Sequence, residues 1–167
     1  DNTLTSNSGY YYSNEKYSFF KKNVVLVNRD YHITCDTLKY NNVTSVAYFL
    51  GFTTIVKIAD STTITCNYGW YDRNKGNSQF SKKVKIVQPG QTLYCDSMNW
   101  NNSDGHGNAH RNILLIDSAN KLQVVGNYAD YNRKLQITKV SNKAIATQVS
   151  DNDSMHLHAD TLYYYSD

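Results

Sequence analysis

The sequence predicts an all-β protein, a repetitive antiparallel β-jellyroll or open, solenoid-like β-trough of many short strands with about 30 residues per unit. Three observations support this prediction. The 15 tyrosines, together with abundant Thr, Val and Ile, fit pleated surfaces, whereas Asn and Asp with Gly mark turns. Similar segments recur at fixed spacing, and within them apolar residues alternate with polar ones. We expect one β-repeat domain over residues 1–167, which could be a piece of a longer chain.

The repeat is clearest when the chain is aligned with itself so that position 7 meets position 67. The segment 7–27 then aligns without a gap with 67–87, and 35–42 aligns with 95–102. A third copy of the latter begins at Ala159, and half-repeats indicate a unit of about 30 residues. The three cysteines follow the same step, so we expect small buried thiols at equivalent positions. Their odd number argues against a complete disulfide framework, and their redox state stays open.

Alternation predicts which apolar side chains face inward. Val84 and Ile86 flank the charged Lys85, and the aligned segments are treated in the same way. A change of phase near Asp36 and near Asp96 predicts a bulge or corner in each unit, which would fold the stacked strands into a trough. The predicted lining or core of this trough is Val24, Leu26, Ile33, Leu38, Val56, Ile58, Ile64, Val84, Ile86, Leu93, Met98, Leu114, Ile116 and Val124.

Aromatic residues recur once in each of the first four units, at Tyr10, Tyr40, Trp70 and Trp100. We expect them to form a ladder of stacked core side chains that joins unit to unit. Rings at the mouth of a trough that contact acyl chains or sugars are the alternative, and the two roles are compatible.

Charge and motifs exclude several function classes. The net charge of +3 is a mild basic excess and no Lys/Arg cluster approaches a nucleic-acid footprint, so no nucleic-acid partner is expected. No apolar run is long enough for a membrane span. The pairs Lys21-Lys22 and Lys82-Lys83 are either solvated edge residues or phosphate contacts for an anionic lipid. The chain begins at Asp1 without an apolar leader, so we expect a signal peptide to have been removed or trimmed.

No catalytic motif is present, and we expect neither an enzyme nor a cofactor. The repeated Asp36, Asp96 and Asp160 could form stacked carboxylates of a polysaccharide-cleaving β-helix, but hydrogen bonding to backbone at a corner explains them better. His156, His158 and Asp160 share one strand face. Because same-face residues of one strand seldom complete a metal site, no metal is expected.

The recurring pattern of an apolar strand followed by x-D-[TS]-[LM]-x-[YW]-N resembles the OstA/LptA family, in the Tyr- and Asn-rich form of the OstA-like proteins of Bacteroidetes. The resemblance extends from about Tyr10 to Tyr165. It implies an open, twisted β-jellyroll in the periplasm that binds the lipid A part of lipopolysaccharide. It further implies end-to-end pairing of strand edges with other β-jellyroll transport proteins or with itself.

The leading hypothesis is therefore non-enzymatic binding and relay of lipopolysaccharide toward the outer membrane through a hydrophobic trough. The alternative is a structural or adhesive β-solenoid of the cell surface that contacts glycans or proteins. A closed and tightly filled interior would favour the alternative, and an open trough lined by aliphatic side chains would favour the carrier.

Overall fold

The computed structural model describes residues 3–150 and 153–165, all of them in strands, turns and short connections. The strands are β1 (Thr3–Thr5), β2 (Ser8–Tyr12), β3 (Tyr17–Val27), β4 (Tyr31–Asn41), β5 (Val46–Lys57), β6 (Thr63–Asp72), β7 (Asn77–Gln88), β8 (Gln91–Asn101), β9 (His106–Asp117), β10 (Leu122–Asn132), β11 (Ile137–Val149) and β12 (Ser154–Tyr165).

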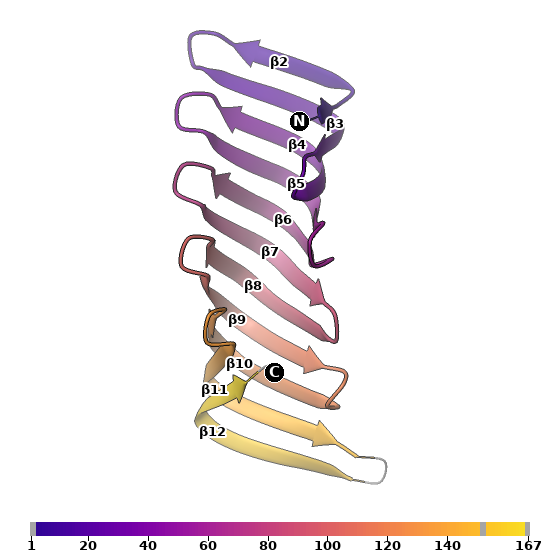
Figure 1. Cartoon of the computed structure of the whole chain (residues 1–167), viewed down its shortest axis with the longest axis vertical. Coiled ribbons are helices and arrows are strands. Elements are labelled where there is room, and N and C mark those ends of the chain that lie inside the picture. Colours follow the sequence, from indigo (N-terminus) through magenta and orange to yellow (C-terminus); the bar gives the residue numbers. More distant parts are fainter. Residues whose placement is uncertain (1–2, 151–152, 166–167) are drawn as a thin grey trace.

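The strands form one antiparallel sheet in which chain neighbours are also spatial neighbours. Its order is β1-β3-β4-β5-β6-β7-β8-β9-β10-β11-β12, with β2 pairing the other half of β3. Figure 1 shows the strands stacked along one axis, from the N-terminal strands at one end to β12 at the other. The sheet is open, because within residues 3–150 and 153–165 β12 pairs only with β11. The predicted all-β, antiparallel, open architecture is confirmed.

Each long odd-numbered strand from β3 to β11 bends near its middle. In β3, Lys22 and Asn23 have φ angles of 61° and 51°, and together they stand opposite the single residue Asp36 of β4. This is a β-bulge, which bends its strand while pairing continues on both sides. The same register shift recurs in the later strands, so the bends line up and fold the whole sheet along its length. The predicted corners at Asp36 and Asp96 are present, although each bulge lies in the partner strand.

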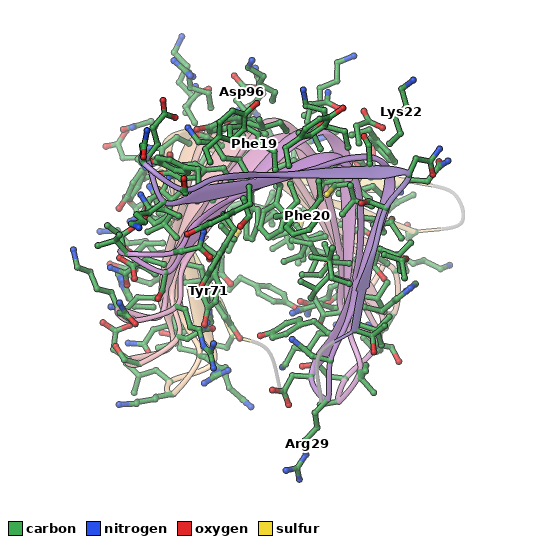
Figure 2. The ribbon with its side chains drawn as sticks, turned by 90° about the horizontal axis from the view of Figure 1, so that it is seen from above. Phe19, Phe20, Lys22, Arg29, Tyr71 and Asp96 are labelled. Carbon is green, nitrogen blue, oxygen red and sulfur yellow. The ribbon has the colours of Figure 1, made fainter. Side chains whose placement is uncertain are left out.

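The bends divide the sheet into two arms joined like an arch (Figure 2). The aromatic arm consists of residues 8–12, 17–21, 37–41, 46–50, 68–72, 77–81, 97–101, 106–110, 128–132, 137–141 and 161–165. The aliphatic arm consists of residues 3–5, 24–27, 31–35, 53–57, 63–66, 84–88, 91–95, 113–117, 122–126, 144–149 and 154–159. Phe20 and Tyr71 project into the arch, whereas Lys22 and Asp96 project from its back.

The strands from β3 to β12 are longer than the short strands expected from the sequence, with 10 to 13 residues each. The difference arises because each bulge is absorbed inside a continuous strand and does not end it.

The turns at the end of the aromatic arm repeat one design. The Asn41 side-chain oxygen accepts the backbone N–H groups of Val43 and Thr44, each at 2.9 Å, and Asp72, Asn101 and Asn132 occupy the equivalent position. Successive turns are also joined to one another by backbone hydrogen bonds.

Candidate functional site

The concave face of the aliphatic arm carries an uninterrupted row of apolar side chains. In the strand register, Leu26 stands opposite Ile33, which stands opposite Ile55, and this pairing continues from one edge of the sheet to the other. The row, here called the aliphatic column, has one member on each strand except β2. Its members are Leu4, Leu26, Ile33, Ile55, Ile64, Ile86, Leu93, Leu115, Val124, Ala146 and Leu157.

The facing aromatic arm carries a row in which large rings alternate with small residues. The register places Tyr71 between Ala47 and Ser78, and Trp100 between Ser78 and Gly107. Each ring comes from an even-numbered strand and is separated from the next by a small residue of an odd-numbered strand. This row, here called the aromatic column, is Tyr11, Ser18, Tyr40, Ala47, Tyr71, Ser78, Trp100, Gly107, Tyr131, Thr138 and Tyr164.

The small residues of the aromatic column make room for the rings. A Cβ atom added at Gly107 would lie 2.5 Å from Cε3 of Trp100. The Trp100 and Tyr131 rings stack across this glycine, with centroids 5.8 Å apart and an interplanar angle of 25°. The rings therefore lie over their small neighbours along the inner face.

Ten of the fourteen predicted lining residues lie on the concave face, and four do not. Val56, Leu114 and Ile116 point to the convex face, and Ile58 lies in a turn with 54% of its surface exposed. The inward positions belong to Ile55, Ile113 and Leu115 instead.

The repeat step explains these four misplacements. The spacing between equivalent residues is alternately one residue shorter and one residue longer than its mean. Val24 pairs with Cys35, which pairs with Thr53, so the equivalent of Val24 in β5 is Thr53 and not Ile55 or Val56. A uniform step therefore moves every second strand by one residue and so to the wrong face.

The same alternation corrects the predicted aromatic ladder. Tyr40 and Trp100 belong to the aromatic column, whereas Tyr10 and Trp70 lie on the convex face. Their immediate neighbours, Tyr11 and Tyr71, occupy the concave positions.

The convex face around Trp70 is polar and connected by hydrogen bonds. Trp70 Nε1 donates to Gln79 at 3.0 Å, Gln79 donates to Asn99 at 2.9 Å, and Asn99 donates to Asn108 at 3.0 Å. These side-chain donors and acceptors therefore find hydrogen-bond partners in one another, without a ligand.

The side chains at the bend of the arch are buried, whereas some of those nearer its mouth are partly exposed. At the bend the two arms meet, and Val24, Val84 and Val140 are at most 1% exposed. One step toward the mouth, Leu93 and Trp100 are only half-buried and pack against that core. Figure 2 shows open space between the two arms of the arch. The half-buried members of the two columns therefore line the trough. Ile55, Ile86, Leu115 and Val124 of the aliphatic column are buried and belong, with the residues at the bend, to its packed floor.

The cysteines belong to this floor. Cys35, Cys66 and Cys95 are free and buried, as predicted. Burial raises the pKa of the Cys35 thiol to about 12, that of Cys66 to about 11 and that of Cys95 to about 12. They are protonated, inert packing groups at neutral pH.

A polar cluster joins the two arms near the C-terminal end of the trough. The Tyr164 hydroxyl, from β12 on the aromatic arm, donates to Asp117 Oδ2 of β9 at 2.5 Å, and Gln91 Nε2 of β8 donates to Tyr164 Oη at 2.8 Å. Asp117 is 3% exposed and also accepts two hydrogen bonds from Asn120. The hydrogen bonds from Tyr164 and then from Asn120 lower the pKa of the Asp117 carboxyl. We call Gln91, Asp117 and Tyr164 the clasp.

The repeated aspartates hold the corners, but through neighbouring strands and not their own backbone. Asp36 Oδ2 accepts the backbone N–H of Phe52 at 3.1 Å, and Asp96 accepts both bonds from the side chain of Asn112, at 3.0 and 3.1 Å. Asp96 also lies 3.4 Å from Arg111. These carboxylates are on the convex side, away from the trough.

Among residues 3–150 and 153–165, no three His, Cys, Asp or Glu side chains come together as metal ligands. His156, singled out in the sequence, instead has its Nδ1 atom 3.0 Å from the Thr147 hydroxyl on β11. Within the same residues, no helix is long and apolar enough to cross a membrane.

The family model for OstA-like proteins matches residues 1–96, which is more than half of the chain. The chain belongs to the OstA-like family. The resemblance inferred from the repeated motif is thereby confirmed, and the two aspartate corners, at Asp36 and Asp96, lie within the matched region.

A solved structure supports the fold of this OstA-like chain. The chain is similar to LptH of Pseudomonas aeruginosa, described as the LptA-homologous periplasmic component of the lipopolysaccharide transport device. The TM-score is 0.55 with 13% sequence identity, over 60% of this chain and 76% of LptH. At this identity the likeness establishes a shared β-jellyroll architecture. No curated protein matches the chain.

Proposed function

We propose that this OstA-like protein binds lipopolysaccharide in the periplasm, with the acyl chains of lipid A in the trough, and passes it toward the outer membrane. The observation that carries the proposal is the aliphatic column facing the aromatic column across an open arch. The aliphatic column crosses eleven strands, and at about 4.8 Å per strand it extends for about 48 Å. A track of that length lined by aliphatic side chains suits lipid chains better than a compact polar ligand.

The driving force would be burial of apolar surface, with no chemical step. Removing apolar surface from water contributes roughly 25 cal/mol per Å². Half-buried members of the aliphatic column, such as Leu26, Ile64 and Leu93, keep surface that an acyl chain would cover. The rings of Tyr71 and Trp100 would cover the opposite side of the chain. The family, and the transport role that the description of LptH states for that protein, favour the same assignment.

Passing lipopolysaccharide onward requires a neighbouring protein, and such a protein could pair with a free edge of the sheet. In the part of the chain that the structure describes, β12 pairs only with β11, and this edge strand carries the exposed Met155, Leu157, Tyr163 and Tyr165. Pairing of this edge with another β-jellyroll transport protein, or with a second copy of this chain, would extend the trough.

The cell-surface adhesive alternative is less well supported. It predicts a filled interior, whereas the arch is open between its arms (Figure 2). The aromatic and amide groups of the convex face are compatible with it, but those amides already bond to one another.

Binding of fluorescent lipopolysaccharide to matched variants tests the proposal. Ile64 lies on the concave face, and Thr65 is the next residue on the convex face. Because Ile64 is already half-buried, an acyl chain would cover about half a side chain, so Ile64→Gln should weaken binding about fivefold. Thr65→Gln should leave binding unchanged. Equal affinity of both variants and the wild type would exclude the trough as the binding site.

A further inference from the structure

The convex bend of the arch carries a row of cationic side chains that the trough does not use. Four of the five bulges place a lysine or arginine at a residue with positive φ, namely Lys22, Lys82 with Lys83, Arg111 and Lys143. With the adjacent Lys21, these residues are all exposed. We call this set the basic ridge, and Lys22 projects from the back of the arch in Figure 2.

The backbone gives no reason for lysine at these positions. Lys82 and Lys83 have φ angles of 62° and 64°, a region in which glycine has no penalty and asparagine has little. The equivalent residue in β5 is Gly51, with φ of 83°, and Asn112 and Asn142 occupy other bulges. The bend therefore accepts Gly and Asn, and the long basic side chains are retained against conformational preference.

The ridge also concentrates the charge of the chain. Asp36, Asp96 and Asp160 lie on strands that pair with the bulged strands. The Asp96 carboxylate already accepts a hydrogen bond from Asn112 and forms an ion pair with Arg111. Six basic groups against three carboxylates leave an excess of three, which equals the formal net charge of +3 of the whole chain. The rest of the chain is electrically balanced, so the convex bend is where an anionic partner would be attracted.

One aromatic residue interrupts the row. Phe52 follows Gly51 in the bulge of β5, at the position that Asn23, Lys83 and Lys143 occupy in other strands, and it is 59% exposed. Its backbone is held in place, because the Phe52 N–H donates to Asp36 Oδ2 at 3.1 Å. A Cβ atom at Gly51 would lie 2.3 Å from the same carboxylate oxygen. Phe52 is thus presented to solvent on a fixed corner among lysines.

We propose that the basic ridge with Phe52 is a peripheral binding surface for an anionic lipid bilayer. Lysines that contact anionic headgroups, together with an aromatic ring that enters the headgroup region, are the two components of interfacial binding. Bulges recur on every second strand, about 10 Å apart, so the cations of β3 and β7 are about 20 Å apart with Phe52 between them, and the bulges of β9 and β11 continue the row along the convex bend. This site lies on the opposite face from the trough and is independent of the proposed function.

Co-sedimentation with phospholipid vesicles tests the ridge. The wild type should bind vesicles of phosphatidylglycerol and phosphatidylcholine, should release them as salt rises, and should not bind phosphatidylcholine alone. The double variant Lys82→Asn, Lys83→Asn should reduce partitioning roughly tenfold or more, because each lysine near an anionic surface contributes about fivefold. The matched control Lys75→Asn, Lys134→Asn removes the same charge from exposed turns and should bind nearly as well as the wild type.

Asparagine occupies equivalent positions in this chain, so the double variant should fold, and its circular dichroism verifies this. The variant Lys21→Gln, Lys22→Asn repeats the test at the far end of the ridge. Equal losses in the ridge and control variants, or binding that salt does not weaken, would overturn the proposal.

The variant Phe52→Ser separates a membrane from a soluble polyanion. It should weaken vesicle binding severalfold while leaving any binding to dextran sulfate unchanged. If Phe52→Ser has no effect on vesicles and dextran sulfate competes fully, the ridge is a polyanion site and the membrane assignment is wrong.

Discussion

The clasp between the two arms predicts a measurable and pH-dependent contribution to stability. Replacing Tyr164 by Phe removes one hydroxyl and keeps the ring in the aromatic column. It deletes the 2.5 Å hydrogen bond to Asp117 and leaves Gln91 without the oxygen that its amide contacts at 2.8 Å. Asp117 keeps its two hydrogen bonds from Asn120, so the variant removes one hydrogen bond from the carboxylate and does not leave it without a partner.

The expected loss follows from the kind of hydrogen bond. A bond to a charged group contributes about 1.5–3 kcal/mol, and the lower end applies because the Asp117 carboxylate keeps its two hydrogen bonds from Asn120. A loss of about 1.5 kcal/mol in a chain of 167 residues should lower the Tm by about 3–6 °C. Thermal unfolding followed by circular dichroism at pH 7 measures it.

The dependence on pH identifies the source of the loss. The folded-state pKa of Asp117 is lowered, so its contribution is present above the unfolded-state pKa of about 3.9 and is lost as pH falls through the folded-state value. The difference between Tyr164→Phe and the wild type should therefore shrink as the pH falls below the unfolded-state value of about 3.9 and through the lower folded-state pKa. An equal Tm at pH 7, or a difference that stays constant into acid, would refute this account of the clasp.

Three further predictions follow from the bend and its floor. Val84→Ala, at a residue 1% exposed, should cost about 2 kcal/mol, whereas Val125→Ala, at a residue 36% exposed, should cost less than about 0.5 kcal/mol; urea unfolding compares them. Gly51→Ala should lower stability by more than about 1 kcal/mol, since its φ is 83°, and Lys83→Gly should raise it by up to about 1 kcal/mol; a reversed order would contradict the assignment of strain. Native protein at pH 8 should react slowly with a thiol reagent at all three cysteines and rapidly once unfolded, because burial raises the pKa of Cys35 to about 12; fast reaction of the folded protein would show an accessible thiol.

Much of the fold could be predicted from sequence because the repeat makes each local signal recur. The alternation around Lys85 identified the inward Val84 and Ile86, and the phase change near Asp96 identified the corner. These features depend on strand periodicity and on a few neighbouring residues, both of which are written locally in the chain.

The errors have one physical source. The mean repeat step averages a longer and a shorter step, and side-chain direction in a strand inverts with every residue. The mean step therefore selected Val56 and Trp70, which face outward, in place of Ile55 and Tyr71. The sequence did contain the correct alternation, in the unequal intervals that separate its three cysteines.

The clasp could not be predicted in this way. Tyr164 lies 47 residues from Asp117 and 73 from Gln91, on the opposite arm of the arch. Contacts across the mouth depend on the twist of the stacked strands and on the angle between the arms. Neither quantity is encoded in the alternation of a single strand.

Site-specific photo-crosslinking tests the central claim, that lipopolysaccharide occupies the trough, most directly. A benzophenone side chain would replace Leu93, on the concave face, or Tyr94, the next residue and 36% exposed on the convex face. After irradiation with lipopolysaccharide, the account predicts a strong adduct from position 93 and little from position 94. Equal adducts at both positions, or none at position 93 in protein that is folded, would contradict it.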